Sequence, residues 1–436
     1  MNFQQNLPRH QYSCSHILLW ISLVTTTATS MRCASRVINL LSIFFNIFVE
    51  SPSWYTGRLW LMRLGYYKIH RAKEIADDWI WIVDHSIQIG SEKCLIILGI
   101  RTRDLPENRS LTFNDVEPID LVPVKKSNGD IVYEQLEDAI KKTGVPREII
   151  SDDGSDLKSG INKFIEQHAE TCRIYDIKHK TASLLKRLFE KDAQWNLFLK
   201  QSLITKAQVQ QTDLAFLASP SQRSKARYMN IDTMVAWGQD VLNFIDREIK
   251  NPSEKFNHEK IKEKLHWVKE FRSQMNVWQN VMSVIETTET FVRHNGLFMG
   301  AEKKLEIELN KLTTLPASNT VKEDLLNFVK GESQKTKENE KLLGSSEIIE
   351  SLFGKQKMLE KGQSNRGFTG LILSVGAFVS TTTEDVVSKA TNTVKTHTVI
   401  QWVDNKIGES VQSLRKNFLH RGKNTEQKWN QLLSIT

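Results

Sequence analysis

The sequence predicts an α/β protein: a mixed five-stranded sheet that a long all-helical insertion interrupts and that a group of helices precedes. Three observations predict this. Short apolar runs that end in polar residues recur between positions 78 and 177, with two helix-like segments among them. Residues 181–340 have the apolar spacing of helices throughout, and so do residues 1–75. A run of strands alternating with helices is typical of a layered α/β fold.

Composition limits the kind of partner. The chain has 436 residues, enough for several domains, and a formal net charge of +8. A basic chain suits an anionic partner such as nucleic acid or an anionic membrane, although a basic surface without any partner gives the same charge. No stretch approaches the ~20 apolar residues of a membrane span. The four cysteines are far apart, which disfavours a zinc module and a disulfide framework. We therefore expect a cytoplasmic protein without a membrane partner.

The N-terminal region is expected to be helical. An apolar segment covers residues 16–24, and Ser30 can cap a second helix. Ser51, followed by Pro52, is the predicted start of a third helix that stops near Gly65.

This third segment is basic, because it contains Arg58, Arg63 and Lys68. Short helices that end with a cationic one suit a helix-turn-helix, whose last helix enters the major groove of DNA. A small helical bundle with solvated arginines is the alternative.

The sheet is predicted from five apolar runs. The run "DDWIWIVDHS" ends on Asp84 and has the continuous apolar character of a strand buried on both faces. Gly90 can turn a hairpin into the second strand at 93–100. The third, at 118–124, contains Pro123, which predicts an edge strand or a short strand. A helix at 129–144, a strand at 147–153, a helix at 157–169 and a strand at 172–177 complete the layer.

Two carboxylates follow strand ends. Asp84 ends the first strand and Asp152 the fourth, and functional side chains of α/β sheets gather at such ends. Two neighbouring carboxylates repel each other unless a cation neutralises them. Hard oxygen ligands favour Mg²⁺ or Mn²⁺, and a third carboxylate would complete a site for two ions. A turn at Asp153–Gly154 is the simpler interpretation of the second acid.

The order of three strands, helix, strand, helix and strand resembles the core of the RNase H-like fold. Within it, "WIVDHS" resembles the first-aspartate motif of DDE-type transposases and integrases, and "ISDDGSD" resembles their second. In that second motif the ligand is the aspartate two residues before glycine. The resemblance therefore implies Asp84 and Asp152 as metal ligands, with Asp153 as the rival.

The third acid of that family usually follows the fifth strand on a helix, often after an inserted helical domain. The segment "SSEIIESLFGKQK" fits this place, with Ser346 as a cap and an apolar face formed by Ile349, Leu352 and Phe353. Glu350 and Phe353 resemble the E-x-x-F signature of hAT-type transposases.

Glu350 and Lys357 also resemble the E-x₆-K of a prokaryotic insertion-sequence group. That group carries Tyr and Arg before the glutamate, where this sequence has Leu343 and Ser346. Glu347, one turn before Glu350, competes for the role of third acid. Weaker competitors are Glu286 and Glu289.

The resemblance implies a DNA transposase that cuts element ends and joins the freed 3′-hydroxyl to target DNA with two Mg²⁺ or Mn²⁺ ions. Lys355 and Lys357 would contact phosphates near the scissile bond, and a solvated helix face is the equal alternative for both. Arg58, Arg63 and Lys68 would contact the double-stranded terminal repeat, and the protein would act as a homodimer or larger multimer. Alternatives are an inactive DNA-binding derivative and an RNase H-like nuclease without strand transfer.

The resemblance further implies that the insertion domain can present an aromatic residue to a flipped base. Trp267, between His266 and Lys269, is the candidate, and the alternative is that all the insertion tryptophans are core residues. His85 and His179 lie near strand ends and are expected to pack or form hydrogen bonds.

The expected domains are a helical DNA-binding domain at 1–75, the first part of the core at 76–180, an insertion at 181–340, the second part of the core at 341–395 and a helical tail at 396–436.

Overall fold

The computed structural model of the chain describes residues 6–8, 10–27, 29–45, 50–87, 93–221, 228, 231–313, 315–362, 369–409 and 418. It divides into two compact units. We call the first, which consists of Met1–Pro106, Ser110–Arg173 and Ser346–Thr436, the α/β unit. The second, Glu107–Arg109 with Ile174–Ser345, is the helical unit. The N-terminal helices therefore belong to the same unit as the sheet, where the sequence suggested a separate domain at 1–75.

The sheet has five strands in the order β3-β2-β1-β4-β5. Strand β1 pairs antiparallel with β2, which pairs antiparallel with β3, and β1 pairs parallel with β4. The strands are β1 (Trp79–Ile87), β2 (Lys93–Arg101), β3 (Glu117–Val124), β4 (Glu148–Ser151) and β5 (Cys172–Tyr175), with α4 (Gly129–Thr143) and α5 (Ser155–Gln167) between the last three. This confirms the predicted mixed sheet and element order, including the edge position of the strand that contains Pro123. Gly90, the predicted hairpin turn, lies outside the described residues.

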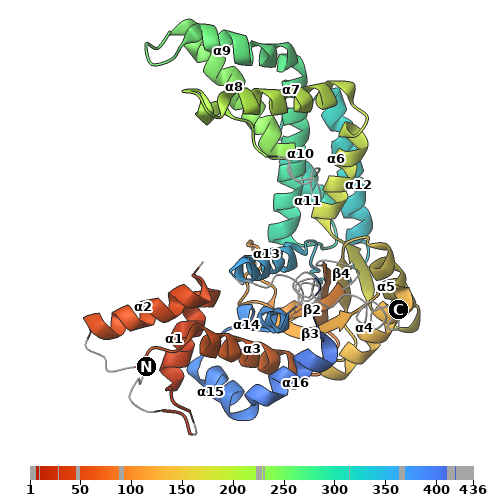
Figure 1. Ribbon diagram of the computed structural model, residues 1–436. Helices are drawn as coiled ribbons and strands as arrows, with labels where there is room; N and C mark the ends of the chain where they lie inside the picture. The colour runs from red at the N-terminus through yellow and green to blue at the C-terminus, as the bar shows by residue number, and fades with distance from the viewer. Residues whose placement is uncertain are drawn as a thin grey trace. The chain divides into compact units, whose positions relative to one another are not determined.

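The two faces of the sheet are covered from different parts of the chain. On one face, alternate residues of β1 (Trp79, Trp81 and Val83) form a core with Leu136 of α4 and Phe164 of α5. The other face is covered by helices that lie far away in sequence. These are α3 (Trp54–His70), which packs against β3, and α14 (Ser374–Phe378), which packs against both α3 and β3 (Figure 1).

The N-terminal helices begin at serine caps. They are α1 (Cys14–Thr25), α2 (Met31–Phe44) and α3. The Ser30 hydroxyl accepts from the Cys33 amide at 3.2 Å, which confirms the predicted cap. The predicted cap Ser51 was wrong: Ser53 accepts from the Thr56 amide at 3.0 Å, whereas Ser51 donates to the Ser35 carbonyl.

Helix α3 continues through Gly65 to His70, so the predicted stop at Gly65 was also wrong. The glycine is there for close packing. A Cβ atom on Gly65 would lie 1.8 Å from the carbonyl oxygen of Leu373, at the end of η4 (Gly370–Leu373). A Cβ atom on Gly376 of α14 would in turn lie 2.6 Å from the Gly65 carbonyl oxygen. Two helix backbones meet here, which only residues without a side chain permit.

Two basic residues of α3 are buried, and this differs from their predicted role in DNA contacts. Arg63 donates from Nε to the Val394 carbonyl at 2.7 Å and from Nη2 to the Thr391 carbonyl at 2.5 Å. Lys68 is fully buried. Helix α3 packs against α15 (Glu384–Thr393) and α16 (Thr396–Lys406) as well as α14. Arg63 and Lys68 therefore hold backbone carbonyls of the C-terminal region, whereas their predicted role was to contact DNA.

Lys68 makes stability depend on pH. Its Nζ donates to the carbonyls of Val379 and Ser380 at 2.7 and 2.9 Å and to the Thr382 hydroxyl at 2.7 Å. Burial, together with nearby Arg71, lowers the pKa of Lys68 to about 7 against the opposing effect of Glu117. The unfolded chain, with a lysine pKa near ~10.4, then binds more protons than the folded chain between these values.

We therefore expect the stability of the wild type, relative to Lys68→Met, to rise as pH increases from about 7 to about 10. Hydrogen exchange of the β1 and β2 amides at several pH values in this range, corrected for intrinsic exchange rates, measures the free energy of unfolding in both proteins. A difference between them that is independent of pH would contradict the prediction. The comparison removes the contribution of Lys73, whose pKa burial also lowers, because both proteins retain it.

The described residues of the helical unit form helices and one isolated β-bridge between Leu297 and Leu342. The helices are α6 (Ile177–Phe189), α7 (Ala193–Val209), α8 (Ile231–Lys250), α9 (His258–Leu265), α10 (Arg272–Asn295), α11 (Ala301–Leu309) and α12 (Pro316–Ser333), with short η2 (Ala215–Leu217) and η3 (His266–Phe271). Across the described part of the chain, no helix combines the length and the apolar character needed to cross a membrane.

An aromatic cluster is the core of the helical unit. Trp195, Trp237 and Trp278 are buried in it. Trp267 is half-buried, lies 5.7 Å from Phe198 between ring centroids, and donates from Nε1 to the Thr205 hydroxyl at 2.8 Å. Because its ring and its N–H are both engaged within the cluster, Trp267 fits the core interpretation better than a base-stacking role.

Candidate metal centre

Strand register brings Asp84 and Asp152 together. In the parallel pair, Ile80, Trp81 and Ile82 of β1 oppose Glu148, Ile149 and Ile150 of β4. Continuing this register by two residues places Asp152 level with Asp84. Residues that are level in a parallel pair project to the same face. The two predicted acids are therefore neighbours across adjacent strands.

Asp84 belongs to the sheet face opposite the α4 and α5 core. Asp84 alternates with Trp81 and Val83, which point toward that core, and so it lies on the face of Ile80 and Ile82. Both Asp84 and Asp152 are half-buried. The Oδ1 atom of Asp84 accepts a hydrogen bond from the His85 amide at 2.6 Å.

Asp152 and its rival Asp153 have different surroundings in the structure. Asp152 Oδ1 accepts from the Gly154 amide at 3.0 Å, one residue before α5 begins, so Asp152 also makes the turn that we expected from Asp153 and Gly154. Asp153 is exposed and forms ion pairs with Arg173 and, at 3.3 Å, with Lys158. Two cations already neutralise Asp153, and strand register aligns Asp152 with Asp84.

Helix α13 (Glu347–Lys361) supplies the predicted third acid and packs against β1 within the α/β unit. Ile349, Leu352 and Phe353 are buried, as their spacing predicted. Both Glu347 and Glu350 lie in the first turn and are half-buried. Their shared turn and similar burial do not distinguish between them as the predicted third acid.

The two lysines of α13 differ in their surroundings. Lys357 is exposed and lies seven residues after Glu350, about two turns, on the same helix face. Lys355 is half-buried, donates to the Thr25 carbonyl at 3.1 Å and lies 4.3 Å from the centroid of the Phe113 ring. It is about 140° around the helix axis from Glu350. Lys357 thus keeps its predicted position beside the acid, whereas Lys355 faces α1.

A second cluster of charged and polar side chains lies near the end of β1, on the sheet face opposite Asp84. We did not predict it from the sequence. Lys93 donates to Asp156 Oδ2 at 2.6 Å, and buried His85 has its Nδ1 3.7 Å from the same atom and its Nε2 3.4 Å from the Ser127 hydroxyl. Burial raises the pKa of Asp156, but Lys93, Ser127 and His85 together lower it to about 2. The pKa of His85 is lowered by burial.

Asp156 is the last residue of "ISDDGSD". Its position two residues after Gly154 is the sequence signal that could have indicated a third acid near this turn. This network keeps His85 in place next to Asp84 in the chain. It confirms that His85 packs and forms hydrogen bonds, the role expected of it.

The remaining glutamate candidates lie in the helical unit. Glu286 and Glu289 line a cavity of about 490 Å³ there, together with Lys178, Arg293 and their neighbours. Glu289 accepts a hydrogen bond from the Thr181 hydroxyl, and burial raises its pKa. Glu289 thus has a structural partner in its own unit.

Nowhere in the described parts of the chain do three or more His, Cys, Asp or Glu residues stand close enough together to hold a metal ion. The fit to a divalent ion therefore rests on the donor chemistry of the aligned pair. Asp84 and Asp152 offer carboxylate oxygens, the donors that Mg²⁺ and Mn²⁺ prefer, and a magnesium ion commonly takes only one or two carboxylates from a protein.

No protein-family model matches the chain, and no curated protein matches its sequence. Among solved structures, the chain is similar to the Drosophila P element transposase strand transfer complex. The alignment covers 88% of this chain and 93% of that one, with 14% sequence identity and a TM-score of 0.36.

Proposed function

We propose that this protein is a DNA transposase of the DDE type with an RNase H-like core, which cuts element ends and joins them to target DNA. The observation that supports the proposal is the register of β1 and β4, which aligns Asp84 with Asp152 when it is continued two residues past Ile82 and Ile150. The sequence motifs around these residues are those that resemble the family, and the strand order of the sheet is compatible with it.

Asp84, Asp152 and Glu350 would hold the two Mg²⁺ or Mn²⁺ ions. When bound, such ions neutralise charge on a phosphodiester and lower the pKa of a bound water. The chain's own part is to fix the acids on a rigid sheet and to position the phosphate. Lys357, exposed on the Glu350 face of α13, is placed to bind a phosphate oxygen. Phosphoryl transfer of this kind needs no protein nucleophile.

The proposed partner is double-stranded DNA at the element ends and at the target, bound by a homodimer or larger multimer. The net charge of +8 supports an anionic partner. In a prokaryotic cell, such an insertion-sequence protein would work in the cytoplasm on the nucleoid.

The test is to incubate the full chain with DNA that carries the ends of its element, with Mg²⁺ or with EDTA. We expect the wild type to nick and join the ends only with Mg²⁺. Glu350→Gln should reduce the rate at least about 100-fold, since even outer partners of metal ligands contribute 10–100-fold. Glu347→Gln, the control one turn away, should retain the wild-type rate within a few-fold.

Other outcomes separate the alternatives. A wild type that binds the ends without cutting them would make the chain a transposase-derived DNA-binding protein. Cutting without joining would make it a nuclease. A loss of activity in Glu347→Gln but not in Glu350→Gln would reassign the third acid.

A further inference from the structure

A cavity in the α/β unit combines cations with aromatic rings. Its volume is about 530 Å³, within the ~300–1,000 Å³ typical of small-molecule sites. It is lined by residues of α1, α2, α3, α13 and the segments next to them. The basic and aromatic residues are Arg32, Trp54, Tyr55, Arg58, Lys355 and Phe378. Among the lining residues in the described part of the chain there is no Asp or Glu.

The two arginines differ from Arg63, which backbone carbonyls hold. In the described part of the chain no carboxylate pairs with Arg32 or Arg58. Arg58 is half-buried, and burial lowers the pKa of its guanidinium. A half-buried cation without a counter-charge is stabilised by a bound anion. Fork-shaped guanidinium donors bind phosphate in particular.

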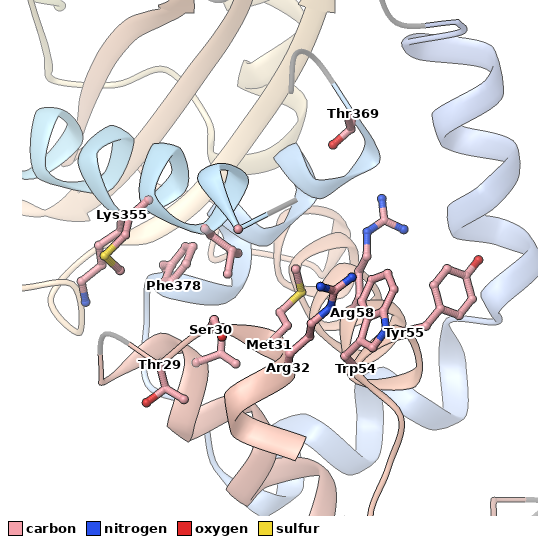
Figure 2. A pocket seen from close by; sticks show the side chains of 14 residues that line it. Thr29, Ser30, Met31, Arg32, Trp54, Tyr55, Arg58, Lys355, Thr369 and Phe378 are labelled. Atoms are coloured by element: carbon pink, nitrogen blue, oxygen red, sulfur yellow. The ribbon is translucent and has the colours of Figure 1, made fainter. Parts of the chain in front are cut away.

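Planar surfaces accompany these charges. The guanidinium carbon of Arg32 lies 5.2 Å from the centroid of the Trp54 ring. Figure 2 shows Arg32, Trp54 and Arg58 on one side of the cavity, with Lys355 and Phe378 across from them. Trp54 is 38% exposed, so its ring remains accessible. Aromatic rings and arginine planes are the surfaces on which nucleic-acid bases stack.

We propose that this cavity binds one unpaired nucleotide, with the base against Trp54 and the phosphate at Arg58 and Arg32. We assign this nucleotide to a DNA strand, and this assignment rests on the proposed function. A free nucleotide carries the same base and phosphate and is the other source of such a ligand. The cavity is separate from the carboxylates. Lys355 and Glu350 are about 7.5 Å apart along the axis of α13 and about 140° apart around it.

The test measures binding in EDTA, where no cutting occurs. Fluorescence anisotropy compares a blunt duplex with the same duplex carrying a single unpaired nucleotide at its end. We expect the wild type to bind the second about tenfold more tightly, the effect of one stacked base and its phosphate. Trp54→Ala and Arg58→Gln should remove this preference, and circular dichroism checks that both variants fold.

The matched control is Arg36→Gln. Arg36 is exposed, lies one turn after Arg32 on α2 and is not a lining residue. This variant loses the same charge and should retain the preference while its general affinity for DNA falls slightly. The inference fails if the wild type binds both DNAs without a preference, if Trp54→Ala and Arg58→Gln keep the preference, or if Arg36→Gln loses it equally.

A second arm measures binding of free dAMP by equilibrium dialysis. If the wild type binds dAMP and Arg58→Gln weakens this binding, the pocket is a nucleotide site. If the same wild type binds no DNA, only the proposed function is contradicted. Normal cutting of element ends by Trp54→Ala, without any nucleotide preference in the wild type, would overturn the pocket and leave the proposed function intact.

Discussion

Asp152→Asn should abolish Mg²⁺-dependent cutting of element-end DNA, whereas Asp153→Asn should leave it within a few-fold of wild type. The two residues are adjacent, have the same side chain and are part of the same turn. Continuing the β1–β4 register two residues past its last pair aligns Asp152, and not Asp153, with Asp84. Asp153 is exposed and already paired with Arg173 and Lys158. Loss of a charged metal ligand should cost more than the ~100-fold upper range for outer-shell partners.

The measurement is the single-turnover rate of strand nicking at saturating protein, with DNA affinity measured separately by anisotropy. Asn is close to Asp in size and still accepts the hydrogen bond from the Gly154 amide, so the turn should survive. Equal loss in both variants would mean that the turn itself is damaged. Loss only in Asp153→Asn would assign the metal to the rival residue and overturn the register argument.

Gly65→Ala should destabilise the α/β unit by at least about 3 kcal/mol. The new Cβ would lie 1.8 Å from the Leu373 carbonyl oxygen. That obstacle is backbone, so no rotamer change relieves the clash, and α3 would have to separate from the η4–α14 segment. Hydrogen exchange of the β1 and β2 amides reports the free energy of unfolding of this unit.

Gly354→Ala is the matched control, since Gly354 also lies inside a helix but a Cβ there would meet nothing within 4 Å. Alanine should stabilise that helix by about 0.5–1 kcal/mol. A small effect of Gly65→Ala would show that α3 and α14 tolerate separation and that the contact is less tight than described.

The sheet could be predicted from the sequence because the pattern of its apolar residues fits few other structures. The continuous apolar run before Asp84 suits a strand covered on both faces, and the order of strands and helices limits how the strands pair. The strand end predicted at Asp84 was wrong, because β1 continues to Ile87. Asp84 lies inside β1 and Asp152 directly after β4, and the β1–β4 register continued by two residues aligns the two acids. Local pattern and topology together predict that pair.

The roles of basic residues could not be predicted in the same way. Arg58 and Arg63 look alike in the sequence, yet one lines a cavity and the other is buried against Thr391 and Val394. The difference arises from segments more than 300 residues away, whose position no local pattern gives. Lys68 and Gly65 were misjudged for the same reason, because each contacts the region between Leu373 and Thr382.

The third acid depends on helix rotation. Glu347 and Glu350 occupy one turn, and the buried stripe of Ile349, Leu352 and Phe353 leaves both half-exposed. Spacing along the chain cannot distinguish two glutamates that one apolar stripe places side by side. A functional comparison of the two variants decides between them.

The packing of α3 has a consequence for biosynthesis. Its partners α14 and α15 are made about 300 residues after it, and the bond from Arg63 to Val394 spans 331 positions. The part of the sheet face that α14 covers therefore remains uncovered until α14 is made, and the side of α3 that packs against α14 and α15 is exposed for the same time. A domain built this way closes only after its last segments leave the ribosome, and it folds slowly because such distant contacts carry a large entropic cost. Nascent chains of this protein should accordingly depend on chaperones until that closure.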